Sequence, residues 1–376
     1  MPVSLINPFR RNYEPLNRIE ISREALSNNY QYLSRLNKNL KIAPVLKSNA
    51  YGHGINLTAK ILDRISAPFF CVDSLFEAYQ LSKININTPI LVMGYFDPLS
   101  LKTKRLPFSF AVFTKEQLFS IIQNQPQAKI HLFVDTGMHR EGIPLAELKN
   151  YFTIIGKNKL CLEGLMTHLA QSDKPEDKQT ENQLKIFGEA RKIAYQMNFF
   201  PKWFHLGNSE TILRIKHYRN NEIGNLVRSG IALYGIDPSK NNDKLKPVLN
   251  LKTKISQIKE ILPGEGVGYD FTFRAKEKTE IAVLPIGYAD GVDRRLSSLG
   301  AVKINHKYCP IIGRVSMNIT TIDVSGIKNF QVGQEVVVFS DRPEDINSIR
   351  NSAKIAKTIP YDLLTGLNPT IKRIII

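Results

Sequence analysis

A lysine follows directly on an apolar stretch near the start of the chain. The run Ile42–Leu46 predicts a short buried strand, and Lys47 comes next, ahead of the small and polar segment Ser48–Gly54. At the end of a buried strand a low dielectric constant lowers the pKa of a lysine, which suits Schiff-base chemistry. The structural alternative is a lysine whose stem lies along apolar surface while its ammonium reaches water. This pattern alone leaves both interpretations open.

Other polar side chains occupy the same position relative to predicted strands. Strand-like runs lie near residues 41–47, 68–73, 89–93, 108–113, 130–135, 161–167, 202–207 and 226–234. Most intervals between them can hold a helix, such as Gln179–Met197, so the alternation predicts a (β/α)8 barrel. Active groups in that fold follow the strand ends. The candidates at such positions are Lys47, Arg140, His168, Asn208, Ser209 and Arg228.

The two parts of the chain differ in their hydrophobic pattern. Residues 1–244 carry the barrel pattern, whereas residues 245–376 are expected to form a mostly antiparallel β domain beyond the polar segment 237–243. The strands expected there are 249–260, 279–285, 301–304, 311–315, 320–324 and 335–339, with a helix over 345–356. Near the start, residues 17–21 predict a strand that is a candidate to pack with the second domain, and Ser22 predicts a helix cap.

Composition limits the class of protein. A chain of 376 residues with a net charge of +17 could bind an anionic partner, but its basic residues are scattered, so nucleic-acid binding is not expected. The apolar runs are too short to span a membrane, and Met1–Pro15 lacks the apolar core of a secretory signal. These features predict a soluble, cytoplasmic protein without membrane partners.

The cysteines are too widely spaced to suggest a metal site. Cys71, Cys161 and Cys309 form no CxxC pair, and no metal is expected. Because Cys71 and Cys161 lie in apolar runs, we expect both to be buried free thiols.

The segment around Lys47 carries a resemblance that resolves the first ambiguity. Residues 45–54 read Val-Leu-Lys-Ser-Asn-Ala-Tyr-Gly-His-Gly, which closely resembles the pyridoxal 5'-phosphate lysine signature of alanine racemases. Alanine racemases belong to the fold-type III class of pyridoxal phosphate-dependent enzymes. The resemblance implies that Lys47 forms the Schiff base with pyridoxal phosphate and that Tyr51 helps hold the phosphate.

Three further segments of the predicted barrel resemble the same family. Asp135–Ile143 implies that Arg140 lies near the cofactor's phenolic oxygen and the substrate carboxylate, for which a guanidinium offers a fixed fork of donors. Met166–Ala170 implies that the His168 imidazole stacks on the pyridine ring. His205–Ser209 implies that Asn208 and Ser209 lie at the phosphate, and Ser209 is also a natural helix cap. Standing alone, each of these residues would more often be structural.

Val227–Gly235 is the segment that discriminates best between reactions. The resemblance implies that Arg228 hydrogen-bonds the pyridine nitrogen and that backbone amides near Gly230 and Ile231 meet the phosphate. Arginine does not give up its proton, so the pyridine nitrogen should stay unprotonated and the ring should be a weaker electron sink. A decarboxylase of similar barrel type would be expected to place a carboxylate there. Arg228 therefore favours racemisation.

The second domain supplies the remaining family signatures. Racemisation at Cα needs a base on each face, and the resemblance assigns these roles to Lys47 and Tyr269, the latter within Gly266–Asp270. It also implies a homodimer whose sites each combine the barrel of one subunit with the second domain of the other. Further residues assigned by resemblance are Tyr288 at the entrance, Met317 at the substrate and Tyr361 at the phosphate.

The sequence therefore predicts an isomerase, a pyridoxal phosphate-dependent alanine racemase that supplies D-alanine for peptidoglycan of the cell wall. Three positions depart from the family pattern: Phe133 where lysine is frequent, Asp270 where glycine is common and Asn318 where aspartate is usual. They keep open a serine or broad-specificity racemase of the same fold. A non-catalytic pyridoxal phosphate-binding protein is the third hypothesis, and it would be expected to lack Tyr269 and Met317.

Overall fold

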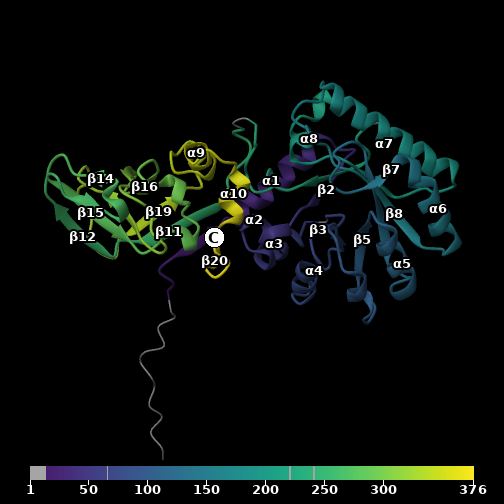
Figure 1. The fold of residues 1–376 in the computed structure, drawn as a ribbon, viewed down its shortest axis with the longest axis horizontal. Helices are drawn as coiled ribbons and strands as arrows, with labels where there is room; N and C mark the ends of the chain where they lie inside the picture. Colours follow the sequence, from purple (N-terminus) through teal and green to yellow (C-terminus); the bar gives the residue numbers. More distant parts are fainter. Residues whose placement is uncertain (1–13, 66, 220–221, 240–241) are drawn as a thin grey trace, which may run out of the picture.

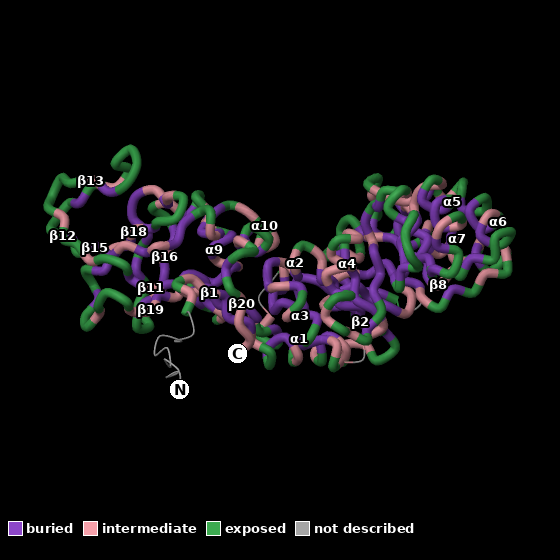
Figure 2. Tube along the Cα trace, turned by 90° about the horizontal axis from the view of Figure 1, so that it is seen from below, coloured by how far each residue is buried: buried purple, intermediate pink, exposed green. Residues whose placement is uncertain are grey.

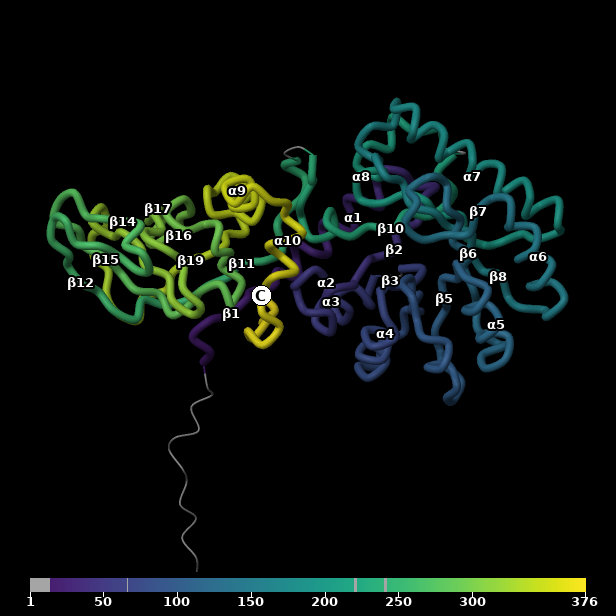
Figure 3. Tube along the Cα trace, viewed as in Figure 1, coloured from purple at the N-terminus to yellow at the C-terminus, as the bar shows by residue number. Residues whose placement is uncertain are grey.

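The computed structural model describes residues 14–65, 67–219, 222–239 and 242–376, which form two lobes (Figure 1). One lobe is a helix-covered barrel and the other consists mainly of strands. The first and last strands of the described chain lie side by side in the second lobe (Figure 3). Most of the Met1–Pro15 segment, which is not expected to be a secretory signal, lies outside the described residues, because these begin at residue 14.

Eight parallel strands form the barrel, one at each position that the sequence predicts. They are β2 (Lys41–Pro44), β3 (Phe70–Val72), β4 (Ile90–Val92), β5 (Phe108–Val112), β6 (Lys129–Asp135), β8 (Cys161–Met166), β9 (Trp203–His205) and β10 (Leu226–Ser229). The short β7 (Ile143–Pro144) pairs with β6. The ring closes because β10 pairs with β2, while single bridges join Val45 to Cys71 and Gly207 to Val227. The barrel prediction is confirmed.

Helices cover the outside of the barrel, as the alternation of strands and helices along the sequence requires. They are α1 (Arg23–Leu36), α3 (Ile55–Leu62), α4 (Leu75–Ser82), α5 (Lys115–Asn124), α6 (Leu148–Lys157), α7 (Lys178–Gln196) and α8 (Ser209–Leu213), with short 3-10 segments η1 (Pro98–Leu101), η2 (Leu145–Glu147) and η3 (Ile215–His217). The Ser22 side chain accepts a hydrogen bond from the Ala25 amide, so the predicted cap is confirmed. Leu26 and Leu33 of α1 are fully buried against the barrel.

Two expectations about the barrel are wrong. The eighth strand ends at Ser229 rather than near residue 234, because the amides of Leu233 and Tyr234 turn back to the carbonyls of Gly230 and Ile231. Cys161 is exposed, since it is the first residue of β8, whereas Cys71 is buried; both are free thiols.

The second lobe is built from three sheets of mostly antiparallel strands. Its elements are β1 (Arg18–Ile21), β11 (Leu249–Lys254), β12 (Gln257–Ile261), β13 (Gly266–Val267), η4 (Tyr269–Phe271), β14 (Phe273–Arg274), β15 (Thr279–Leu284), η5 (Tyr288–Asp290), η6 (Arg294–Leu296), β16 (Ala301–Ile304), β17 (Lys307–Pro310), β18 (Thr320–Asp323), β19 (Glu335–Phe339), α9 (Ile349–Ile355), α10 (Pro360–Thr365) and β20 (Lys372–Ile375). The largest sheet has the order β17-β16-β19-β11-β1-β20. Strand β1 pairs antiparallel with β11 and parallel with β20, so the start of the chain belongs to this sheet.

Two of the strands expected in the second lobe differ from the structure. The run 249–260 divides into β11 and β12. The Ile255 amide donates to the Gln334 carbonyl, just before β19, whereas the Ser256 amide donates to the Val283 carbonyl of β15. Because β19 and β15 belong to different sheets, the run passes from one sheet to the other at this point. Residues 311–315 are not a strand: Gly313 has φ of 69° and interrupts the extended backbone, and the strand lies at Lys307–Pro310 instead. The buried core runs through both lobes (Figure 2).

No helix among the described residues is long and apolar enough to cross a bilayer.

A buried histidine supports the loop that follows Lys47. The ring of His53 is 1% exposed, stacks on Tyr234 with ring centroids 4.3 Å apart, and bonds through Nδ1 to the carbonyls of Ala50 and Tyr51. Burial lowers the pKa of His53 to about 4, although those two carbonyls oppose the shift. His53 is therefore neutral in the folded protein at neutral pH.

Replacing His53 by Phe should make the stability less sensitive to acid. The unfolded chain takes up the His53 proton below pH ~6.5 and the folded chain only near pH 4, so protons favour unfolding within that window. The wild-type unfolding free energy should fall by up to about 1.4 kcal/mol per pH unit from this residue alone, and the variant should lose that slope. Urea unfolding at pH 7, 6 and 5 measures it. Exposed His217→Phe is the control, and an unchanged slope in His53→Phe would contradict a neutral His53.

Candidate active site

A cavity of about 190 Å³ lies where the barrel strands end, and it collects most of the predicted residues. Those that line it are Lys47, Tyr51, Arg140, His168, Asn208, Ser209, Arg228, Gly230, Ile231 and Tyr361. All come from the barrel except Tyr361, which lies on α10 of the second lobe, where that helix packs against the Lys47 loop. The sequence therefore predicted this group of residues correctly as neighbours.

Lys47 is paired with a carboxylate that the sequence did not suggest. Its Nζ lies 3.2 Å from Oδ1 of Asp73, the residue after β3, and its side chain is 39% exposed. The expectation of a lysine enclosed in a low dielectric is therefore wrong for this structure, because the strand end opens onto the cavity. Asp73 closes the predicted strand 68–73, so the strand-end rule itself could have indicated it.

The backbone after Lys47 turns in the left-handed sense. Residues 48–51 have φ between 52° and 55°, a conformation that costs roughly 1–2 kcal/mol per residue outside glycine. Specific bonds hold it: the Ser48 amide donates to Glu77 Oε1 at 2.6 Å, and Asn49 Oδ1 accepts from the Ile55 amide at 2.9 Å. Arg373 of β20 donates to the Gly52 carbonyl at 3.0 Å. This turn positions Lys47 and Tyr51 at the cavity.

Arg228 is held rigidly at the floor of the cavity. It is 5% exposed, and its two terminal nitrogens bond to His205 Nδ1 (2.8 Å), His205 O (2.7 Å), Thr167 O (2.7 Å) and His168 Nδ1 (3.2 Å). A guanidinium has five N–H donors, so four are engaged. The Nε–H has no acceptor among the described residues. Arg228 thus has one donor left for a ligand in the cavity.

His168 and Arg140 form another part of the wall. Burial, together with the cations Arg228, Arg140 and Lys47, lowers the pKa of His168 to about 3, so the ring is neutral. Its Nδ1 accepts from Arg228, which leaves the proton on Nε2. Arg140 lies 3.7 Å from Glu141 and is 55% exposed. Phe133, one of the three positions that depart from the resemblance, is buried against Met166 and adds an apolar ring to the lining.

Hydroxyl and amide donors converge at another part of the cavity. A Cβ on Gly230 would lie 2.4 Å from the Tyr51 hydroxyl, and Ser209 Oγ accepts from the Gly230 amide at 3.0 Å. The Ile231 amide has no acceptor among the described residues. Burial raises the pKa of both Tyr51 and Tyr361 well above the usual range, so both keep their protons. This group can bind an anion through neutral donors.

One detail of that region corrects the sequence interpretation. Helix α8 begins at Ser209 and its cap is Asn208, whose Oδ1 accepts from the Glu210 and Thr211 amides. Asn208 rather than Ser209 therefore fills the capping role, which frees the Ser209 hydroxyl to bond Gly230 and Ala232.

Three predicted residues do not reach this cavity. Tyr269, Tyr288 and Met317 are 67%, 42% and 57% exposed on the second lobe. The amide of Ala289 bonds to the Met317 carbonyl at 2.9 Å, and Asp270 pairs with Arg314 at 2.9 Å, so these segments belong to one surface. The β13–β14 hairpin that carries Tyr269 lies at the end of the lobe away from the barrel (Figures 1 and 2). Within one chain the cavity lacks Tyr269.

Comparison with known proteins identifies the fold and both lobes. The family models of the alanine racemase N-terminal domain and of the alanine racemase C-terminal domain match residues 21–238 and 248–375. The chain belongs to the alanine racemase family. Alanine racemase 1 of Clostridium acetobutylicum is 34% identical over 375 residues, 95% of this chain and 94% of that protein.

Solved structures of alanine racemases share the whole architecture. The enzyme from Bacillus anthracis with bound L-Ala-P has a TM-score of 0.87 at 32% identity and covers 97% of this chain and 96% of its own. The enzyme from Bartonella henselae with covalently bound pyridoxal phosphate has a TM-score of 0.83 at 26% identity and covers 96% of this chain and 100% of its own. Racemases are isomerases, so the family activity is an isomerase activity.

Several residues that support the cavity escaped the sequence analysis. Gln183 of α7 donates to Thr136 at 3.1 Å and to the His168 carbonyl at 3.0 Å, and so ties two strand ends together. Glu77 accepts from the amides of both Ser48 and Asp73. No local pattern marks either residue, because each acts on segments distant in the sequence.

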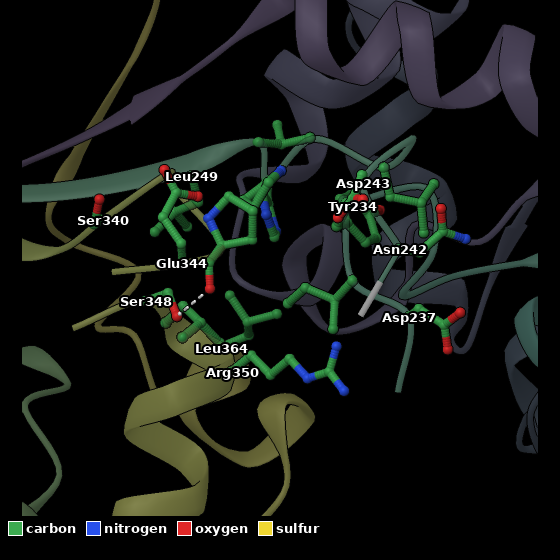
Figure 4. Close-up of a pocket in the computed structure, with 18 residues that line it drawn as sticks. Tyr234, Asp237, Asn242, Asp243, Leu249, Ser340, Glu344, Ser348, Arg350 and Leu364 are labelled. Carbon is green, nitrogen blue, oxygen red and sulfur yellow. Dashed lines mark hydrogen bonds between the residues drawn. The ribbon is translucent and has the colours of Figure 1, made fainter. Parts of the chain in front are cut away.

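A second cavity lies between the two lobes and contains none of the predicted site residues. Its volume is about 130 Å³, and its lining includes Tyr234, Asp237, Glu344, Ser348 and Arg350 (Figure 4). The close-up shows residues of the barrel and of the α9 region facing one another. We assign the chemistry to the barrel cavity, where the unused donors converge.

Substituting Gly230 by Ala should weaken the binding of pyridoxal phosphate to the barrel cavity. The added Cβ would lie 2.4 Å from the Tyr51 hydroxyl and would displace it. We expect the dissociation constant, measured by absorbance titration of the apoprotein, to rise about ten-fold, which corresponds to roughly 1.4 kcal/mol of overpacking. Gly188→Ala, where nothing lies within 4 Å, is the matched control. Equal affinities for the two variants would argue against an anion site beside Gly230.

Proposed function

We propose that this protein interconverts L-alanine and D-alanine with pyridoxal 5'-phosphate bound in the barrel cavity. The observation that carries the proposal is the convergence of Lys47, the neutral donors around Gly230, and the spare Nε–H of Arg228 in one cavity. Membership of the alanine racemase family supports the same reaction. We extend the proposal to the supply of D-alanine for peptidoglycan in the cytoplasm, and to a domain division at residues 244 and 245.

The residues around the cavity fit this cofactor. Tyr51, Ser209 and the Ile231 amide would hold the phosphate, with Asn208 and Tyr361 beside them, because all are uncharged groups able to donate to an anion. Arg228 would donate its remaining N–H to the pyridine nitrogen, and the neutral His168 would lie against the ring. Lys47 supplies the amine for covalent attachment. When bound, the cofactor withdraws electrons from the substrate and acidifies its Cα proton.

Two groups would move the proton at Cα. Lys47 takes or gives it on one face, and Asp73, at 3.2 Å, holds the ammonium in place when it is protonated. Tyr269 of the partner subunit would serve the other face. Arg140 would bind the substrate carboxylate, and Glu141 Oε2, 3.7 Å from Arg140 Nε, pairs with the same guanidinium.

A homodimer with shared sites is part of the proposal. Tyr269, Tyr288 and Met317 are exposed on the face of the second lobe, and the hairpin of Tyr269 lies far from the barrel of its own chain. Phe271 and Ile319 add exposed apolar surface near them, at 57% and 49%. A second copy that placed its barrel opening against this face would bury these groups and complete both cavities.

Purified protein loaded with pyridoxal phosphate should racemise L-alanine, and Lys47→Ala should reduce kcat by at least about 1,000-fold because both the attachment point and one base are lost. Circular dichroism or a coupled D-alanine assay measures turnover. Serine and lysine are run beside alanine. Faster turnover of serine or lysine would move the assignment to a broader racemase and direct attention to Phe133 and Asn318. Absence of turnover with the cofactor bound would sink the catalytic proposal.

Mixing two inactive variants tests the shared site. In a heterodimer of Lys47→Ala and Tyr269→Phe subunits, one cavity would carry both defects and the other neither. With random exchange, half of the dimers are mixed, so activity should return to about a quarter of wild type. Mixtures that stay inactive, while size exclusion confirms exchange of tagged subunits, would show that Tyr269 does not act on the partner's cavity.

A further inference from the structure

A chain of buried side chains runs through the barrel from Arg228 to its opposite end. His205 Nε2 lies 2.8 Å from His131 Nδ1, and His131 Nε2 lies 3.3 Å from Glu163 Oε2. Both histidines are fully buried. They come from β9 and β6, whereas Glu163 lies on β8 near the amino-terminal end, where Lys129 contacts it at 2.8 Å. The chain thus joins the cavity floor to the far rim.

Arg228 and Glu163, the two ends of this hydrogen-bond chain, determine which nitrogen of each imidazole carries the proton. Arginine only donates, so His205 must accept at Nδ1 and carry its proton on Nε2. His131 must then accept at Nδ1 and donate from Nε2, which meets a carboxylate that can accept. Burial lowers the pKa of both histidines, and this agrees with neutral rings. No other arrangement of protons satisfies all three hydrogen bonds while Glu163 stays ionised.

Glu163 is the anionic end of the chain. Burial alone would raise its pKa, but hydrogen bonds from His131 and Lys129 outweigh that effect and lower the pKa to about 2. Ser109 adds a third donor at 3.2 Å. Arg228, by contrast, has no carboxylate in contact among the described residues, although it is a buried cation. Its bonded partners are two rings and two carbonyls.

The barrel wall is shaped for this arrangement. A Cβ on Gly164 would lie 2.1 Å from His131 Nδ1, so β8 can carry only glycine beside the ring. Phe69 packs edge-on against His131 and also meets His205, at 5.4 Å and 5.9 Å between centroids. Apolar packing excludes water from the two imidazoles and directs their polar atoms along the chain.

We propose that Glu163, acting through His131 and His205, is a positioning residue for Arg228. The carboxylate orients both imidazoles, and they hold the guanidinium so that its Nε–H faces the cavity. Because Arg228 faces the proposed cofactor, the effect on turnover rests on the proposed function; the hydrogen-bond chain itself does not.

Glu163→Gln tests the role of the charge while keeping an acceptor oxygen. We expect kcat for alanine racemisation to fall about ten-fold, because a neutral amide holds the two imidazoles behind Arg228 less firmly than a carboxylate does, with KM for alanine within about two-fold. Glu147→Gln, which removes a carboxylate from the exposed pair with Lys115, is the charge-matched control and should retain full activity. A wild-type kcat in Glu163→Gln would overturn the proposal.

A double-mutant cycle separates positioning from a merely structural role. If Glu163 acts only through Arg228, adding Glu163→Gln to Arg228→Lys should change kcat less than about two-fold. Equal losses in both backgrounds would show that Glu163 acts by some other route, such as general barrel stability. Should Glu163→Gln fail to fold, His131→Asn interrupts the same chain and enters the same cycle.

Ring-nitrogen NMR of histidine-labelled apoprotein gives a readout that does not depend on turnover. Both His131 and His205 should be neutral with the proton on Nε2, and Glu163→Gln should shift the resonances of His205 as well as those of His131. A shift confined to His131 would contradict transmission to Arg228. If the wild-type protein did not racemise alanine, the proposed function would be wrong. The NMR measurement would still show whether the hydrogen-bond chain links Glu163 to Arg228.

Discussion

The site depends on the pairing of β10 with β2, which closes the barrel. The Val45 amide donates to the Ser229 carbonyl at 2.8 Å, and the Leu46 amide donates to the Cys71 carbonyl at 2.8 Å. These bonds place β2, which leads to Lys47, between β3, which leads to Asp73, and β10, which carries Arg228. A slip of one residue in either pairing would turn the side chains of β2 to the opposite face. The register of this closure therefore decides which groups share the cavity.

The part of the cavity around Gly230 is organised around neutral donors, whereas charged side chains such as Lys47, Asp73 and Arg140 line the rest. Burial keeps the hydroxyls of Tyr51 and Tyr361 protonated and keeps the His168 ring neutral. Fixed donors of this kind need little reorganisation when an anion binds, because their directions are already set by packing. Arg228 is the buried exception, and the long hydrogen-bond chain behind it gives its charge a distant counterpart in Glu163.

The two lobes contribute to the chemistry in different ways. Tyr361 reaches the cavity of its own chain because α10 packs against the Lys47 loop, and Arg373 ties β20 to the same loop through Gly52. The surface with Tyr269 faces away from the barrel. One face of the second lobe thus supports the local site, whereas the other carries the exposed Tyr269, Tyr288 and Met317.

Local sequence was enough to locate the elements and most of the site. Apolar runs mark strands because burial acts on neighbouring residues, so all eight barrel strands, the Ser22 cap and the segment around Lys47 were predictable. The tertiary structure alone decided which distant groups meet. Lys47 pairs with Asp73, 26 residues away, the run 249–260 divides between two sheets, and His131, Glu163, His205 and Arg228 join from four strands. Such contacts depend on barrel closure and strand register, which no short segment encodes.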